Sequence, residues 1–110
     1  MKYIAFAVAS IFLFAFLSFA AVEEGETLFK SMGCMSCHNP EKASRINPSL
    51  MEISQAYQGK TQQLSDYFDG RREAIVRPEK AGMMKRYVEK TKTLTDGQRS
   101  ALAAFVLLHK

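Results

Sequence analysis

The sequence predicts an all-α fold in one small domain. Apolar residues recur at helical spacing in four segments after residue 20, and no segment alternates with the period of two that a strand would show. Glycines and prolines stand between these segments, where they begin or end helices. The chain of 110 residues has no internal repeat and no linker, so its length provides for one domain and no more.

Residues 1–20 are predicted to be a secretory signal peptide. Lys2 supplies a positive start, the run from Ile4 to Phe19 is almost entirely apolar, and small residues occupy positions 18 and 20, where a signal peptidase reads. The mature domain is then residues 21–110, exported to the periplasm. The apolar run is shorter than the roughly 20 residues that a membrane-spanning helix needs. An uncleaved membrane anchor stays open as the alternative.

The first two helices of the mature domain are expected on either side of a proline-containing loop. The first covers residues 23–32, with acidic residues in its first turn and Gly33 as its end. The second begins at Pro48, because the fixed backbone angle of proline suits a first turn, and ends at Gly59.

A third helix is expected in TQQLSDYFDG, residues 61–70, which has apolar residues on one face and a glycine at its end. Residues 71–93 have weak periodicity and contain a proline and a glycine, so they are expected to be mainly a long loop, which in a compact domain is usually functional. The last segment predicts the clearest helix, because Thr95 and Gln98 form a capping box before an apolar run.

Both cysteines of the chain stand in the stretch CMSCH, residues 34–38. Thiol–disulfide exchange uses such pairs in folds that contain strands, and no strand is expected here. A structural zinc site needs four ligands, and His109 is the only other histidine. Cys-x-x-Cys-His is the attachment motif of c-type haem. We therefore predict one haem c joined through Cys34 and Cys37, with His38 as its proximal iron ligand.

The spacing of this motif agrees with that chemistry. Two intervening residues in a helical turn separate the sulfurs by about the distance between the two vinyl groups on one porphyrin edge, and the next residue brings an imidazole beneath the ring. Export also agrees, because c-type haem is attached on the far side of the cytoplasmic membrane. A bound haem would stabilise a domain that is otherwise small for its core.

With these motifs, the chain resembles the class I c-type cytochromes, in particular the small bacterial monohaem electron carriers. The resemblance covers nearly the whole mature chain and rests on GETLFKSMGCMSCH, INPSL, a methionine in the late loop and LTDGQRSALAAFVL. It implies four to five short helices wrapped around one covalently bound haem, with the first and last helices crossing where Gly25 and Phe29 meet Phe105. It also implies that the carbonyl of Pro48 accepts a hydrogen bond from the proximal histidine and so orients its ring.

The resemblance further implies a methionine as the second axial ligand, an arrangement that suits electron transfer. Met83 and Met84 follow a glycine in the late loop, whereas Met51 is expected to fill the core. Many family members carry a proline just after the ligand methionine, and this chain does not. The choice therefore stays open between the two, with Met84 favoured over Met83 because family members read methionine-lysine at this place. His109 is expected at the surface.

The expected function is that of a periplasmic carrier, not an enzyme, which passes single electrons between respiratory redox proteins. Its partners would be a membrane quinol-oxidising complex and a terminal oxidase or reductase. A formal charge of +4, spread along the chain, favours acidic partners but is too small to indicate nucleic acid, and no nucleic-acid partner is expected. We expect a monomer without a small-molecule substrate. The candidate neighbours of the haem propionates are Tyr57, Tyr67, Arg71 and Lys85.

Two alternatives to the free carrier stay open at this point. The chain could be the haem-bearing subunit of a specific periplasmic dehydrogenase or reductase, held in a stable complex. It could also be a haem protein with an open iron position that binds small ligands or peroxide, if neither Met83 nor Met84 binds the iron.

Overall fold

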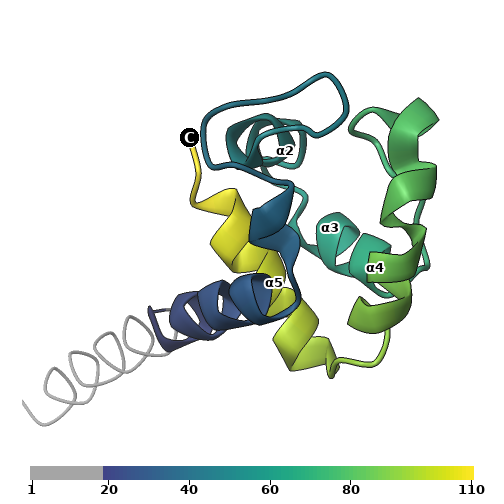
Figure 1. The fold of residues 1–110 in the computed structure, drawn as a ribbon. Helices are drawn as coiled ribbons and strands as arrows, with labels where there is room; N and C mark the ends of the chain where they lie inside the picture. The colour runs from purple at the N-terminus through teal and green to yellow at the C-terminus, as the bar shows by residue number, and fades with distance from the viewer. Residues whose placement is uncertain (1–18) are drawn as a thin grey trace, which may run out of the picture.

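The computed structural model describes residues 19–110, so residues 1–18 of the predicted signal peptide lie outside the described residues. An N-terminal helix covers residues 19–31. It is followed by η1 (Cys34–Ser36), α2 (Leu50–Ala56), α3 (Thr61–Phe68), η2 (Pro78–Met84), α4 (Lys85–Thr91) and α5 (Asp96–Leu107) (Figure 1). Residues 19–110 contain no strand, which confirms the all-α prediction. No helix in this part of the chain is long and apolar enough to cross a membrane.

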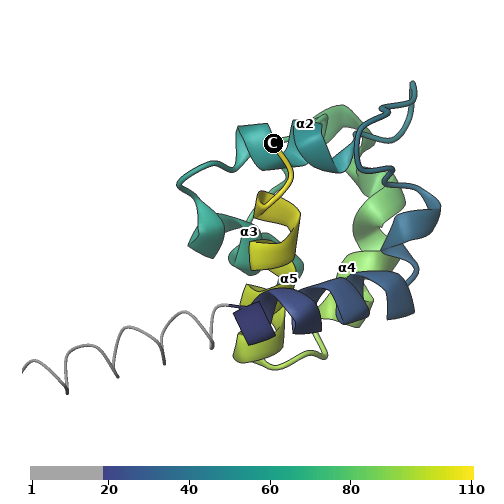
Figure 2. The same ribbon diagram turned by 90° about the vertical axis from the view of Figure 1, so that its left-hand side faces the viewer.

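The N-terminal helix lies across α5, as Figures 1 and 2 show from two directions. Gly25 is buried at the crossing, where an added Cβ would come within 2.0 Å of the carbonyl oxygen of Ala101. One turn further on, the rings of Phe29 and Phe105 pack with their centroids 5.4 Å apart. The structure therefore confirms the helix crossing that the resemblance to the c-type cytochromes implied.

The hydrophobic core lies between this crossing and the helices α2 and α3. Its buried members are Phe29, Leu50, Tyr57, Leu64, Phe68, Leu102, Ala103, Phe105 and Val106. A polar contact adds to the packing of α2 on α5, because the hydroxyl of the fully buried Ser54 donates to the carbonyl oxygen of Leu107 at 3.2 Å. Helix α5 thus lies at the centre of the core, where the N-terminal helix, α2 and α3 pack on it.

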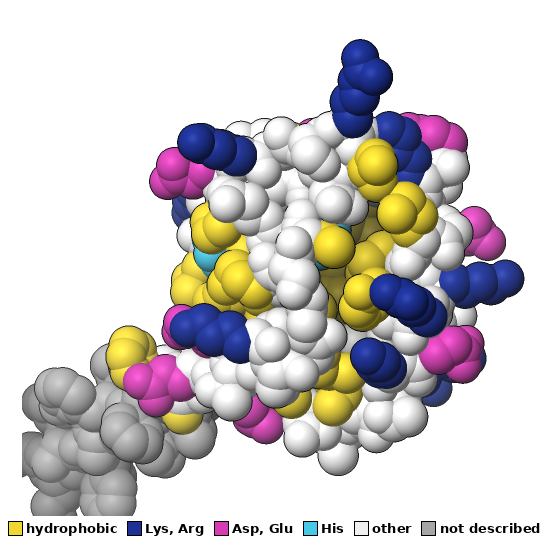
Figure 3. Space-filling model, in the orientation of Figure 1, with side chains coloured by type: hydrophobic (Ala, Val, Ile, Leu, Met, Phe, Trp, Pro, Cys, Tyr) yellow, Lys and Arg dark blue, Asp and Glu magenta, His cyan; other side chains and the backbone are white. Residues whose placement is uncertain are grey.

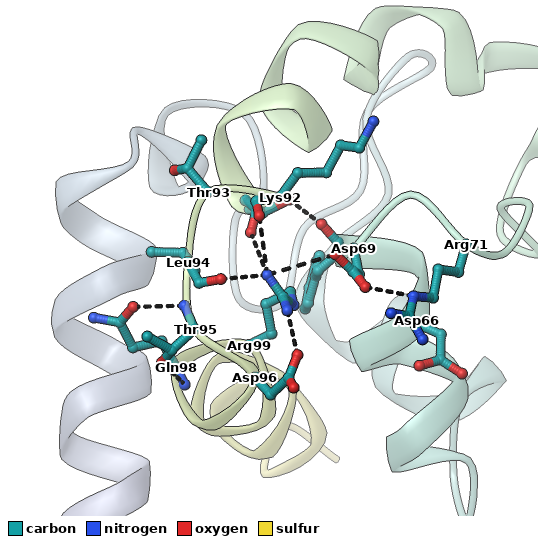
Figure 4. A network of polar contacts seen from close by, with 12 residues as sticks. Asp66, Asp69, Arg71, Lys92, Thr93, Leu94, Thr95, Asp96, Gln98 and Arg99 are labelled. Atoms are coloured by element: carbon teal, nitrogen blue, oxygen red, sulfur yellow. Dashed lines mark hydrogen bonds and ion pairs between the residues drawn. The ribbon is translucent and has the colours of Figure 1, made fainter.

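The buried side chain of Arg99 joins the ends of α3 and α4 to the start of α5 (Figure 4). Its guanidinium donates to the carbonyls of Thr91, Lys92 and Leu94 and pairs with Asp69 and Asp96. The Thr91 hydroxyl donates to the carbonyl oxygen of Phe68 at 2.6 Å. These bonds satisfy carbonyls that the ends of two helices would otherwise leave unpaired.

Two expectations about local structure are wrong. Residues 71–93 are not mainly loop, because they contain η2 and α4. The η2 segment is short and contains Pro78 and Gly82, and its apolar residues line the cavity, so the sequence offers no helical stripe directed to the core. Pro48 does not open α2. Ser49 is its N-cap and accepts a hydrogen bond from the Glu52 amide at 3.1 Å. The capping box expected at Thr95 is present.

Candidate haem-binding site

A cavity of about 540 Å³ opens between the core and the η2 segment. Its volume falls within the range of roughly 300–1,000 Å³ that is common for cofactor sites. In the space-filling view of Figure 3, hydrophobic side chains gather in and around a hollow, and Lys and Arg side chains stand along its rim. The apolar part of the lining comes from Phe29, Leu50, Ile53, Leu64, Phe68, Leu102 and Val106, among others.

The segment from Gly33 to His38 brings the three predicted attachment residues to this cavity. Gly33 ends the N-terminal helix in the left-handed conformation, with φ of 80°, which glycine adopts without strain. The chain then turns tightly through η1, and the His38 amide donates to the carbonyl oxygen of Cys34 at 3.0 Å. Cys34, Cys37 and His38 all line the cavity. Cys34 is half-buried, and burial raises the pKa of its thiol.

The imidazole of His38 is buried and oriented by Pro48. Its Nδ1 lies 2.9 Å from the carbonyl oxygen of Pro48. A carbonyl can only accept a hydrogen bond, so Nδ1 carries the proton, and in the neutral ring Nε2 keeps its lone pair. This is the tautomer that a metal-binding histidine needs.

Two backbone hydrogen bonds hold the Pro48 carbonyl where His38 can reach it. The Leu50 amide donates to the carbonyl oxygen of Asn39 at 2.9 Å, and the Met51 amide donates to that of Pro40 at 3.1 Å. The start of α2 is therefore paired with the two residues that follow the histidine. Two amides of the first helical turn, which have no partner within the helix, are used to build the site.

Met83 and Met84 are the two methionines of residues 19–110 that line the cavity. Met83 is 59% exposed, whereas Met84 is half-buried. Met84 also lines a second, smaller hollow together with Cys34, Cys37 and His38. These positions favour Met84 over Met83 as the residue that reaches the iron. Met51 does not line the cavity. It is half-buried and belongs neither to the hydrophobic core nor to the residues packed against it, so the expectation that it fills the core is wrong.

The candidate neighbours of the propionates are only partly brought together. Tyr57, Tyr67 and Lys85 line the cavity. Arg71 does not, and this expectation is wrong: its side chain is 75% exposed and pairs with Asp69 at 2.7 Å. His109 also lies outside the cavity lining, with Nδ1 at 3.1 Å from the carbonyl oxygen of Phe105.

Burial gives the two tyrosines of the cavity the same protonation state. It is the main cause that raises the pKa of both Tyr57 and Tyr67, and the proximity of Tyr57 raises that of Tyr67 further. Both side chains are therefore neutral phenols near pH 7 and can donate a hydrogen bond to an acidic group.

Three cationic residues of the lining escaped prediction: Arg77, Lys80 and Arg86. Arg86 contacts Tyr87, since its Nη2 lies 3.2 Å from the phenol oxygen and its guanidinium lies 5.1 Å from the ring centroid. Arg77 is paired with Glu52, 25 positions earlier in the chain. Contacts over such a separation have no local sequence signal by which they could have been found.

The residues of the site fit a covalently bound haem. Cys34 and Cys37 stand on a helical turn with two residues between them, and the oriented His38 offers Nε2. The half-buried thioether of Met84 lines the same cavity, whose walls are largely apolar. The all-α fold and this site define a c-type haem protein. The family model for cytochrome c matches residues 22–110, and the chain belongs to the cytochrome c family. A search of curated proteins found no match.

Membership of this family settles the general class of function. Its cofactor is haem c, consistent with Cys34, Cys37 and His38, and the function that it implies is haem-based electron transfer between redox proteins. Members are typically carriers that do not catalyse a reaction of their own.

Proposed function

We propose that this protein is a periplasmic monohaem cytochrome that carries single electrons between larger respiratory redox proteins. The observation that supports this most is the hydrogen bond of 2.9 Å between His38 Nδ1 and the Pro48 carbonyl. It selects the imidazole tautomer that binds iron and holds the ring in a cavity that Met84 also lines. A histidine and a methionine on one iron fill both axial positions, as an electron carrier requires.

Each residue of the site has a separate role in this proposal. Cys34 and Cys37 would form the thioether bonds, and His38 Nε2 and Met84 Sδ would be the axial ligands. When bound, haem c supplies an iron that gains and loses one electron. The chain holds the same two ligands in both oxidation states, and its apolar walls keep water away, so that little rearrangement accompanies each transfer.

The rim of the cavity supports transient docking to acidic partners. The cations Lys80, Lys85 and Arg86 are exposed lining residues, and the exposed side chains of Ile46 and Met83 stand among the same lining. Charge of this kind speeds encounter more than it tightens the complex, which suits a carrier that must leave each partner quickly. We propose a membrane quinol-oxidising complex as the donor and a terminal oxidase or reductase as the acceptor.

The test is the visible spectrum of the haem-loaded protein in both oxidation states, with and without carbon monoxide. We expect the reduced protein to be six-coordinate and its spectrum not to change with carbon monoxide, because Met84 occupies the distal position. A high-spin protein whose reduced spectrum shifts on adding carbon monoxide would contradict the proposal and indicate an open iron.

A second measurement separates the free carrier from a dedicated subunit. In gel filtration with a detergent extract of membranes, we expect the carrier to elute as a monomer at its own size. Co-elution with one dehydrogenase or reductase would instead show a stable complex. Mass spectrometry of the exported protein tests the predicted cleavage after Ala20 at the same time.

A further inference from the structure

Arg77, which lines the cavity, is joined by its side chain to helix α2 and to the loop that precedes this helix. Its Nε and Nη2 donate to the two carboxylate oxygens of Glu52 at 2.9 and 3.0 Å, and its Nη1 donates to the carbonyl oxygen of Ser44 at 2.7 Å. Three of its donors are thus used, and the Arg77 side chain is only 23% exposed. Such a two-point contact fixes direction as well as distance, which a lysine cannot do.

The partners of Arg77 belong to the segment that orients the histidine. Glu52 stands in the first turn of α2, four residues after Pro48, and its amide is bonded to Ser49. Ser44 lies in the loop that leads to Pro48, and its amide donates to the carbonyl oxygen of Asn47 at 2.9 Å. Arg77 is therefore bonded to residues before and after Pro48 in the chain, and the carbonyl of Pro48 orients His38.

Arg77 itself is the residue from which the Met84 segment starts. It is the N-cap of η2, which ends at Met84, and no residue of η2 is buried in the protein core. Lys80, on the first turn of η2, reaches the carbonyl oxygen of Arg45 in the same loop. Polar bonds to residues 44, 45 and 52 thus hold the start of this segment, next to Val76, which packs against the core.

The backbone of Arg77 shows that this contact is held against a local preference. Its φ of 46° and ψ of 59° are left-handed, and it is the one non-glycine residue of positions 19–110 with positive φ. The next residue is Pro78, and a residue before proline prefers an extended conformation. The left-handed conformation is thus unfavourable both for a residue with a side chain and for a residue before proline. Residues in such conformations persist where the surrounding contacts hold them, and they concentrate at functional sites.

We infer that Arg77 is a positioning residue for the axial methionine. Through Glu52 and Ser44 it fixes the start of η2 relative to the segment that carries Pro48, and so sets where Met84 stands relative to His38. This inference rests on the proposed axial role of Met84. Without the bonds from Arg77 to Glu52 and Ser44, the side chain of Met84 should leave the iron more readily, while the haem stays attached through the cysteines.

The test measures how easily an added ligand displaces the methionine in the haem-loaded ferric protein. Imidazole is titrated while the weak red absorption band of methionine-bound ferric iron is followed, in the unmutated protein, R77Q, E52Q and the double variant. R71Q is the matched control, because Arg71, like Arg77, pairs with a carboxylate but lies outside the cavity lining. T95A controls for general loosening, since it removes a helix cap far along the chain from the Arg77–Glu52 pair.

We expect R77Q and E52Q each to bind imidazole about tenfold more tightly than the unmutated protein, a change that corresponds to about 1.4 kcal/mol. The double variant should gain little beyond either single one, because the two residues act as a pair. R71Q and T95A should keep the affinity of the unmutated protein. An R77Q protein that keeps the red band and binds imidazole no more tightly than the unmutated protein would overturn the role of Arg77 but not that of Met84. An equal gain in imidazole affinity in T95A would do the same. An unmutated protein without the red band would overturn the axial methionine and this inference with it.

Discussion

The crossing of the N-terminal helix with α5 leads to a sharp prediction for Gly25→Ala. A Cβ at this position would lie 2.0 Å from the carbonyl oxygen of Ala101 and 2.8 Å from the Cβ of Phe105. Ordinary contacts begin at 3.4 Å, so the two helices would have to separate by about 1.4 Å at this point. The clashing atoms belong to backbone and to a Cβ, which no change of rotamer can move away.

This separation should cost about 3 kcal/mol of unfolding free energy, the upper part of the usual range for overpacking, because it also loosens the neighbouring contact between Phe29 and Phe105. For a domain of this size, that corresponds to a melting temperature lower by roughly 12–24 °C. The assay is denaturant unfolding of the haem-loaded protein, followed by far-ultraviolet circular dichroism.

Gly97→Ala is the matched control, since its added Cβ would meet nothing closer than the Thr95 hydroxyl at 3.9 Å. Within α5, alanine should stabilise the protein by about 0.5–1 kcal/mol relative to glycine. A Gly25→Ala protein as stable as the unmutated one would refute the close helix crossing on which the described fold depends.

Two further predictions concern buried polar groups. Arg99→Met should lower the unfolding free energy by about 3 kcal/mol, while the reduction potential stays unchanged, because it leaves the buried carbonyls of Thr91 and Lys92 without this donor and removes one of the two cations beside Asp69. An unfolding free energy from urea denaturation within about 1 kcal/mol of the unmutated value would contradict the network. Burial raises the pKa values of Tyr57 and Tyr67, so their contribution to stability is complete below about pH 10 and is lost as the pH rises through the raised values. Unfolding measured from pH 9 to 12 should therefore show a shallower loss of stability in Tyr67→Phe, and an identical slope would count against burial as the cause.

The residues that sequence analysis placed correctly are those whose role depends on a short stretch of chain. The attachment motif at residues 34–38 is a single helical turn, and the capping box at Thr95 spans four residues, so both can be recognised locally. The crossing at Gly25 and the Pro48 carbonyl were expected from the resemblance to the cytochromes c, and both contacts are present. Local motifs and a family pattern together were enough for the proximal half of the site.

The other half of the site depends on contacts that the sequence does not display. The apolar residues of η2 line the cavity and do not form a stripe toward the core, and Pro78 and Gly82 are typical of loops. The pair formed by Arg77 and Glu52 joins positions 25 residues apart, and the left-handed backbone of Arg77 is imposed by those contacts and not by its type. The sequence offered Arg71 as one of four candidate neighbours of the propionates, but its side chain pairs with Asp69 and does not line the cavity.

The most direct test of the central claim is the red absorption band of the ferric, haem-loaded protein, compared in the unmutated chain, Met84→Ala and Met83→Ala. If His38 and Met84 are the axial pair, the band is present in the unmutated protein, is lost in Met84→Ala and is kept in Met83→Ala. Loss of the band only in Met83→Ala would assign the ligand to the neighbouring residue. Absence of the band from the unmutated protein would contradict the account of this chain as a six-coordinate electron carrier.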